Sequence, residues 1–333
     1  MKSIQALSVL ATMMLTMMPA VVSPVPVLSQ EIPTAVHCSN CSNNQSILQV
    51  TPYNPGVEGH LVISTIIHGP TEMMLVDSQL RTSEGAELAK KLKAMNKKLI
   101  AIYISHEHVD HHWGVWEVLK VFPNTPVYSS PESVKGIEQG NAAGGSASYR
   151  PYPYYRDSPK MSYIPTPFTN DTLAIDGENV EFLRIGRGDT YPVVSVYVPS
   201  VNTLVAADLV VAGMHVLVAD SPEKEQRQEW LQTLQKVREM TLNGTTVIAG
   251  HIGNENHSSI ATVEVIDSNI QYLNTFEEAL LEPNRSAAWN YVMSRFDTLE
   301  MPFLLDWSLD VFYEDSGRIP ETNNQSLIIS STM

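Results

Sequence analysis

The feature that most constrains this chain is the segment Ser-His-Glu-His-Val-Asp-His-His at 105–112, which directly follows an unbroken apolar run. A short apolar run predicts a buried strand, so the polar segment is expected to be the loop at its end. In such a loop, His106 and His108 can turn their imidazoles toward one metal ion, while Asp110 and His111 turn toward a second. A solvated histidine-rich loop is the alternative, but four histidines and one aspartate within seven residues favour a metal centre.

The types of side chain also indicate which metals this centre would take. Imidazole and carboxylate suit Zn²⁺, with Fe²⁺ and Mn²⁺ as competitors. Two ions a few ångströms apart can share a bridging water. We therefore expect two metal ions per chain, with Zn²⁺ as the first choice.

Length and charge limit the class of protein. The 333 residues allow one large domain or two ordinary ones, and an apolar share of 43% is that of a globular chain with a sizeable core. The formal charge is -15, and no basic run is longer than a pair of lysines. Such a surface repels polyanions, so we expect a small-molecule substrate and no nucleic-acid partner. The oligomeric state is left open.

The amino terminus has the pattern of a secretory leader. Lys2 precedes a long apolar stretch that ends in small residues, which predicts a signal peptide over 1–23 with cleavage between positions 20 and 29. The stretch is just long enough to span a bilayer, so an uncleaved membrane anchor is the alternative. Gln5, Ser8 and the Pro-Val-Pro sequence that follows favour the cleaved signal. We expect a secreted, extracellular protein.

Glycosylation sequons give a second, independent indication of export. Seven Asn-X-Ser/Thr motifs occur, where roughly three are expected by chance at this composition. They begin at Asn40, Asn44, Asn170, Asn243, Asn256, Asn284 and Asn324. The two cysteines, Cys38 and Cys41, lie in the polar lead-in, where a local disulfide is favoured over half of a zinc cage.

Hydrophobic periodicity and turn residues predict the order of the elements. Strands are expected at 61–68, 73–77, 99–104, 126–128, 172–175, 180–185, 193–198, 203–207 and 245–249. Helices are expected from 83, at 113–122, from 131, at 223–241 and at 258–281. The segment 140–167 lacks a period and is predicted to be a long surface loop, whose tyrosines either roof an apolar pocket or belong to an insertion without a role. The chain from Pro302 onward is expected to be irregular.

This order of elements predicts the fold class. Strands, a helix, a second set of strands and further helices, without an internal repeat, suit an α+β protein in which two sheets pack between helices, a four-layer αββα sandwich. The predicted divisions are a signal peptide at 1–23, a polar glycosylated lead-in at 24–50, the folded domain at 51–300 and a carboxyl-terminal tail at 301–333.

Three further polar residues each follow an apolar run, where the end loops of a sheet would converge. They are Asp189 in the sequence Gly-Arg-Gly-Asp-Thr, Asp208 after Leu-Val-Ala-Ala, and His251 after Val-Ile-Ala-Gly. Singly, each is better explained as an ordinary loop residue. Together with the histidine-rich loop they form one candidate set of metal ligands.

With these residues in place, the chain resembles the metallo-β-lactamase-fold hydrolases from about Leu61 to His251. The resemblance rests on the His-X-His-X-Asp-His motif and on the order of the residues that follow it. It implies that Asp77, in Leu-Val-Asp, is the family's structural aspartate and supports the metal loop from outside the ligand set. It also implies that Asp208 bridges both metals and that His251 matches the late Gly-His. Secreted fungal members of the family open lactone or lactam rings, and we expect this chain to be a member of that kind.

The chain departs from the family at one ligand. The family usually has Gly-His-Thr where this chain has Gly188-Asp189-Thr190. The first metal would then have two imidazoles and a carboxylate in place of three imidazoles. This change bears on the affinity and identity of the metal.

The chemistry implied by the resemblance is hydrolysis. A metal-bound water would act as the nucleophile, and Asp110 would both bind the second metal and orient that water. The fold serves esters, lactones, lactams, thioesters and phosphodiesters, and does not choose among them. The acidic surface argues against polyphosphates, and the tyrosines and tryptophans favour a small apolar or aromatic ester, lactone or lactam.

Two residues are weaker candidates for substrate contact. His215 could touch the substrate, although a histidine that flanks a strand is the simpler explanation, and Trp113 could line the pocket or pack at a helix start. Two other functions also stay open. One is a metal-binding protein of the same fold without turnover, and the other is a thioesterase of the glyoxalase type.

Overall fold

The computed structural model describes residues 47–56, 59–148, 155–253 and 258–313, which lie in one compact unit. Its first sheet has the strand order β1-β2-β3-β4-β5-β6. The strands are β1 (Gln49–Tyr53), β2 (Ser64–His68), β3 (Glu72–Val76), β4 (Lys98–Ile104), β5 (Val127–Ser129) and β6 (Thr166–Pro167). Strands β1 to β3 pair antiparallel, whereas β3 to β6 run parallel.

The second sheet has the order β12-β11-β10-β9-β8-β7. Its strands are β7 (Thr172–Ile175), β8 (Glu178–Leu183), β9 (Ser195–Val198), β10 (Thr203–Ala212), β11 (Thr246–Ile252) and β12 (Ile260–Ala261). Strands β10 and β11 pair parallel, and every other pair is antiparallel. Each sheet therefore contains neighbouring parallel strands whose carboxyl ends meet at one edge.

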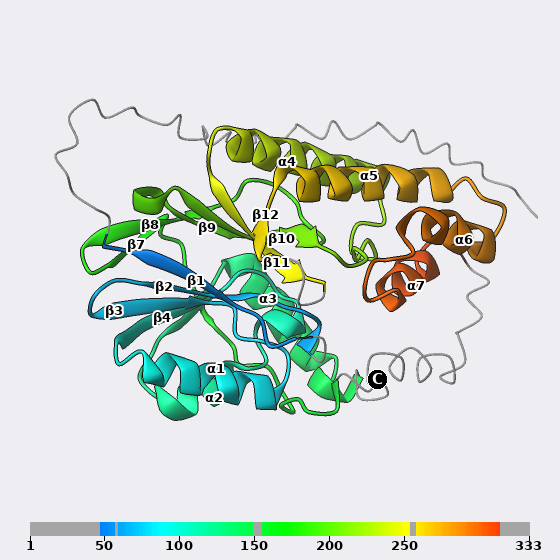
Figure 1. Ribbon diagram of the computed structural model, residues 1–333. Coiled ribbons are helices and arrows are strands. Elements are labelled where there is room, and N and C mark those ends of the chain that lie inside the picture. The colour runs from blue at the N-terminus through cyan, green and yellow to red at the C-terminus, as the bar shows by residue number, and fades with distance from the viewer. Residues whose placement is uncertain (1–46, 57–58, 149–154, 254–257, 314–333) are drawn as a thin grey trace, which may run out of the picture. The chain divides into compact units, whose positions relative to one another are not determined.

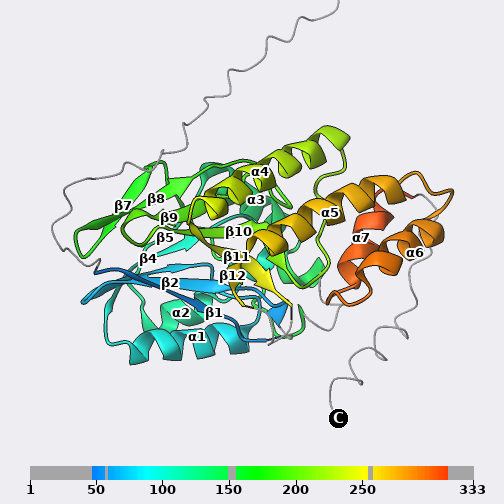
Figure 2. The same cartoon turned by 45° about the horizontal axis from the view of Figure 1, so that its top comes forward.

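Helices cover the outer face of each sheet (Figures 1 and 2). The helices on the side of the first sheet include α1 (Thr82–Ala94), α2 (Val115–Val121) and α3 (Pro131–Ala142), and α4 (Lys224–Leu242) and α5 (Val263–Ala279) cover the second. Two further helices, α6 (Arg285–Phe296) and α7 (Phe303–Asp310), lie next to α5 on the same side of the molecule. Short 3-10 turns lie at η2 (Val109–His111), η3 (Gly145–Ser148) and η5 (Pro199–Val201). The result is the predicted four-layer αββα sandwich.

Successive side chains of a strand point to opposite faces of the sheet, and this alternation explains how the layers pack together. In β3, Met73 and Leu75 pack under α1 and α2, whereas Met74 and Val76 face the second sheet. All four side chains are buried, because both faces of this sheet are covered. Strands buried on both sides appear as continuous apolar runs, which is why periodicity located β2, β3 and β4 so closely.

Most of the predicted elements are confirmed within a few residues, but strands β1 and β6 were not predicted and further errors lie late in the chain. The helix expected from Ser258 begins at Val263, because Ile260 pairs with Ile248 as part of the short strand β12. Strand β10 continues to Ala212, beyond the predicted end at 207. The chain after Pro302 was expected to be irregular, but it forms α7, whose Leu305 and Leu309 are fully buried. Helix α6 was not predicted.

Several predictions fall outside the described residues. The leader, Cys38, Cys41 and the end of the chain after 313 all lie there, and the predicted domain limits stay a prediction. Among the helices that the structure describes, none combines the length and apolar character needed to cross a bilayer.

Candidate metal centre

The loop after β4 is held by one buried carboxylate at the end of the neighbouring parallel strand. Asp77 follows β3, and its Oδ1 accepts the backbone N–H of Ser105 at 2.8 Å. Its Oδ2 accepts both the Ser105 hydroxyl and the Nδ1–H of His111, each at 2.8 Å. Asp77 is 2% exposed and has a φ of 59°, a conformation that aspartate tolerates better than most residues. The aspartate therefore fixes the start and the far end of the histidine-rich loop.

The hydrogen bonds of the histidines decide which ring nitrogen each one presents. Because the Ser105 hydroxyl donates to Asp77, His106 Nδ1–H donates to Ser105 Oγ at 2.9 Å. His111 likewise donates Nδ1–H to Asp77, and His108 donates Nε2–H to Asp220 at 2.7 Å. A ring that gives one proton to a fixed acceptor offers its other nitrogen as a ligand.

The second sheet supplies the opposite side of the centre. His251, on β11, donates Nδ1–H to the carbonyl of His60 at 2.7 Å and thereby presents Nε2. Asp208 lies inside β10 next to Ala207, whose φ of 49° marks an irregular register between β10 and β11. A left-handed alanine costs on the order of 1–2 kcal/mol, and here it accompanies the bend that carries Asp208. Asp208 and His251 thus lie within their strands, not after them as expected.

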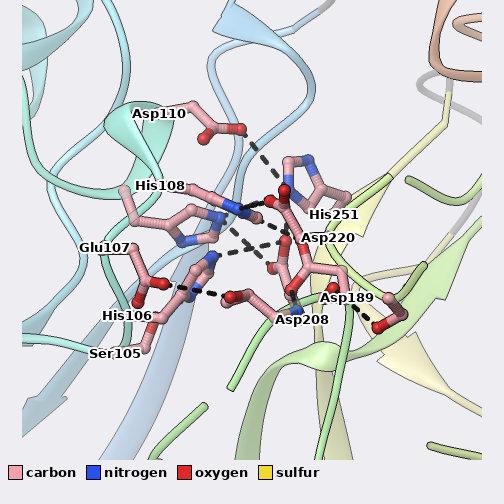
Figure 3. Close-up of polar contacts among 12 residues, drawn as sticks. Ser105, His106, Glu107, His108, Asp110, Asp189, Asp208, Asp220 and His251 are labelled. Carbon is pink, nitrogen blue, oxygen red and sulfur yellow. Dashed lines mark hydrogen bonds and ion pairs between the residues drawn. The ribbon is translucent and has the colours of Figure 1, made fainter. Parts of the chain in front are cut away.

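Two groups of side chains converge in this space (Figure 3). The first contains His106, His108, Asp189 and Asp208, and the second contains Asp110, His111 and His251; within each group the ligand atoms lie within 4.8 Å of one another. Asp208 reaches both groups, with Oδ1 3.3 Å from His111 Nε2 and Oδ2 3.0 Å from His251 Nε2. The structure therefore brings together all seven predicted ligands and separates His106 and His108 from Asp110 and His111, as predicted.

Asp189 enters the first group through one carboxylate oxygen. Its Oδ2 lies 2.9 Å from His108 Nδ1, while its Oδ1 accepts the N–H of Thr190 at 2.7 Å. The residue is 3% exposed, and burial raises the pKa of its carboxyl to about 7. One oxygen of Asp189 therefore caps the local turn, and the other faces the cluster.

The buried charges of the cluster shift the pKa values of its histidines in opposite directions. Burial lowers the pKa of His111, but the neighbouring Asp208, Asp77 and Asp110 outweigh it and hold that pKa well above its ordinary value. His106 behaves in the opposite way, because burial and the charge of His111 hold its pKa well below 6.5. Metal binding to such a cluster releases protons, so it weakens as the pH falls.

The fit to a divalent cation rests on the donor set and on one buried atom. His106 Nε2 is buried and has no hydrogen-bond partner among the described residues, although Asp208 Oδ2 is 3.8 Å away. His111 Nε2 and His251 Nε2 face each other at 3.3 Å. Buried polar atoms that point at one another and not at protein partners are typical of ligands, and imidazole with carboxylate suits Zn²⁺, Fe²⁺ or Mn²⁺.

A cavity of about 520 Å³ adjoins the first group and includes His108 in its wall. Trp113 lines it, together with Tyr155, which comes from the loop predicted to roof a pocket, whereas Tyr149, Tyr152 and Tyr154 lie outside the described residues. His215 is not among the lining residues. It is fully buried, and its ring contacts the Tyr272 hydroxyl at 3.0 Å, so its position fits the simpler explanation of a packed histidine.

Sequence reasoning did not select three residues near the centre. Asp220 bonds His108, His60 Nδ1 lies 3.8 Å from Asp110 Oδ2, and Glu107 lies between two candidate ligands. Asp220 follows an apolar stretch, the same signal that marked Asp208. His60 carries no comparable signal, because only the long-range contact between the two ends of the domain brings it here.

The family of the chain follows from this geometry together with a sequence match. Residues 59–251, more than half of the chain, match the family model described as "Metallo-beta-lactamase superfamily". The chain belongs to the metallo-β-lactamase superfamily. The match begins beside His60 and ends at His251, so it includes every candidate ligand.

Two curated relatives match part of the chain. A hydroxyacylglutathione hydrolase of Buchnera aphidicola is 43% identical over 49 residues, which is 15% of this chain and 19% of that protein. A probable metallo-hydrolase of Streptococcus pyogenes is 27% identical over 134 residues, 32% of this chain and 58% of that protein. The chain thus spans about a fifth of the length of the hydroxyacylglutathione hydrolase and just over half of the length of the metallo-hydrolase.

A solved structure shares the fold. A metallo-β-lactamase family protein of Thermus thermophilus aligns with a TM-score of 0.56 and 18% identity, covering 79% of this chain and 93% of the other. At this identity the likeness concerns the fold alone. It agrees with the two mixed sheets and their flanking helices.

We predict that Asp77→Asn weakens metal binding about 10–100-fold, the usual effect of losing a group that orients a ligand. Asparagine also tolerates positive φ, but its amide nitrogen would face His111 Nδ1, so the ring would turn a proton toward the cluster. Competition with a chelator measures the affinity. The matched control is Asp176→Asn, which changes a partly exposed carboxylate that also has positive φ and bonds the backbone of Thr71. Equal affinities in all three proteins would contradict the role of Asp77.

Asp189 provides a separate test of the first group. We expect Asp189→Ala to weaken metal binding and Asp189→His to shift the preference from Mn²⁺ toward Zn²⁺, because imidazole is the softer ligand. Metal titration into the stripped proteins measures both effects, with the exposed Asp171→Ala as control. If Asp189→Ala binds each metal as wild type does, Asp189 only caps the turn.

Proposed function

We propose that this protein is a metal-dependent hydrolase that cleaves a small apolar or aromatic ester, lactone or lactam. The observation that carries the proposal is the proton arrangement of four histidines, each of which gives one ring proton to a protein acceptor and turns its other nitrogen into the cluster. Such pre-orientation is the mark of a ligand set and has no evident purpose in a merely packed core. Membership of the superfamily supports hydrolysis as the reaction class.

The proposed ligands are His106, His108, Asp189 and Asp208 for one ion, and Asp110, His111, His251 and Asp208 for the other. A divalent ion held there supplies Lewis acidity, which polarises a carbonyl and makes water a stronger acid. Asp110 is the candidate catalytic residue, because it is partly exposed beside His251 and can orient a water molecule and accept its proton. His60 Nδ1 lies 3.8 Å from the same carboxylate oxygen that faces His251, and it limits how far that carboxylate can turn.

The cavity beside the first group is the proposed substrate site. Trp113, Tyr155 and Trp307 give it an aromatic wall, and a volume of about 520 Å³ suits a small ring-containing molecule. An apolar wall excludes water from the reacting carbonyl and strengthens the electrostatic interactions of the centre. We therefore place the acyl group of the substrate near His108, with its apolar portion against these aromatic rings.

A thioesterase of the glyoxalase type is the second candidate. It is favoured by the local identity with the hydroxyacylglutathione hydrolase. The match spans too little of that protein to carry its substrate over, and the described cavity wall contains no lysine or arginine to bind the carboxylates of a glutathione moiety. The third candidate is a metal-binding protein without turnover. Its main support is Asp189, which stands where the family usually has histidine.

Hydrolysis should depend on the metal. We expect the purified protein to cleave at least one member of a panel of aryl esters, lactones, lactams and thioesters. Turnover should cease after chelation and return on adding Zn²⁺, Mn²⁺ or Fe²⁺, because Lewis acidity drives the reaction. Asp208→Ala should stay inactive under every metal, with Asp171→Ala as control.

Two outcomes would contradict this function. Turnover that survives both chelation and Asp208→Ala would exclude the centre from the reaction. Stoichiometric metal binding without hydrolysis of any panel member would favour a metal-binding protein.

We further propose that the protein is exported and glycosylated. The leader and the seven sequons support this, and Asn170, Asn243 and Asn284 are exposed in the folded unit. The native mature protein should lack its first 20–29 residues and lose mass on endoglycosidase treatment. Mass spectrometry that finds the leader intact and every sequon unmodified would refute export by this route.

A further inference from the structure

The cavity beside the metal centre has fixed acidic groups as well as aromatic walls. Glu107 and Asp220 are the acidic residues among its described lining, and that lining includes no lysine or arginine. Both lie next to candidate ligands, Glu107 by sequence and Asp220 through its bond to His108 (Figure 3). A substrate that reaches the centre must therefore pass close to two carboxylates.

Glu107 is held in a single position. The Thr190 hydroxyl donates to its Oε1 at 3.0 Å, and its side chain packs against Gly136 of α3, where an added Cβ would lie 2.9 Å from the Glu107 Cβ. Its Oε2 is buried without a hydrogen-bond partner among the described residues. The Glu107 carboxylate is therefore held in place with one oxygen hydrogen-bonded and the other without a partner among the described residues. Its charge acts electrostatically on any molecule that enters the cavity.

Nearby cationic groups cancel these charges only in part, since the ring of His108 donates to the Asp220 carboxylate while no lysine or arginine joins the described lining. Arg187 is the nearest arginine to Asp220 along the contacts of the structure, but it binds the backbone oxygen of Asp220 and not the carboxylate. Its guanidinium also lies 3.5 Å from Glu229 and over the ring of Tyr191, outside the cavity lining. Asp110, Asp189 and Asp208 add three carboxylates that offset most of the charge of two divalent ions.

We propose that Glu107 and Asp220 make the cavity selective for acyl substrates without negative charge, namely neutral or cationic aromatic esters and lactones, and that they reject carboxylates. This selectivity rests on the proposed hydrolase function. A carboxylate about 10 Å from a like charge at an effective dielectric constant of about 20 is disfavoured roughly tenfold. A cation is attracted by the same groups and by the faces of Trp113, Tyr155 and Trp307.

Binding tests the selectivity without any need for turnover. Three phenols of similar size would be titrated into the full-length protein, metal-free and Zn²⁺-loaded, with tryptophan fluorescence or calorimetry as the readout. They are 3-hydroxyphenyltrimethylammonium, its neutral isostere 3-tert-butylphenol, and 3-hydroxybenzoate. We expect the neutral phenol to bind about tenfold more tightly than the benzoate to the metal-free protein, because the ring of His108 offsets one of the two carboxylates, and the cation to bind more tightly than the neutral phenol.

Charge-neutralising variants identify the source of the selectivity. Glu107→Gln and Asp220→Asn should each narrow the difference between the neutral and anionic phenols about tenfold. The matched control is Glu138→Gln, which removes an exposed charge on the same helix that packs against Glu107 but does not line the cavity. Equal binding of all three phenols, or equal effects of Glu107→Gln and Glu138→Gln, would overturn the proposal.

The acetate esters of the same phenols separate the selectivity from the reaction. Cleavage of the cationic and neutral esters, with at least about tenfold lower kcat/KM for the carboxylate, supports both proposals. Equal kcat/KM for all three esters overturns the selectivity and leaves the hydrolase function intact. Selective binding without cleavage of any ester counts against hydrolysis of aryl esters, and the selectivity of the cavity still stands.

Discussion

The carboxylate of Asp77 is the constraint on which the rest of the centre depends. It accepts three hydrogen bonds from two residues of one loop, and it lies at the end of the strand parallel to the one that carries that loop. A buried carboxylate is stable only when it is well satisfied, so its own requirements force Ser105 and His111 into place. The orientation of His106 follows, because Ser105 has no other proton to give. One residue outside the ligand set thus determines the geometry of two ligands.

Much of the fold could be predicted because the central strands of both sheets are buried on both faces. Runs such as Leu99–Ile104 leave no ambiguity about a strand, and their polar ends locate the loops that approach the metal. The site was predictable for the same reason, since a polar side chain at or shortly after the end of an apolar run requires an explanation. His106, Asp189 and His251 all carry that signal, although they lie far apart in sequence.

What escaped prediction depends on contacts between distant segments. The sequence predicts that Ile260 lies near the start of a helix, but its pairing with β11 makes it a strand residue. Helix α7 begins after a proline and is short, yet its Leu305 is buried in the same hydrophobic cluster as residues of α5 and α6. Asp208 looked like the last residue of a strand because the bend at Ala207 has no signature in the sequence. The role proposed for Glu107 depends on its contacts with Gly136 and Thr190, which are distant from it in the sequence.

The division of the ligands between the sheets has a consequence for the durability of the protein. The loop after β4, in the first sheet, carries His106, His108, Asp110 and His111, whereas Asp208 and His251 belong to the second. An ion held by both sets joins the two halves of the sandwich as a cross-link would, and its binding free energy adds to the folding free energy. At a free metal concentration 100 times the Kd, this linkage amounts to about 2.7 kcal/mol. With such an ion bound, the free energy of unfolding of the chain would depend on the metal supply of its surroundings.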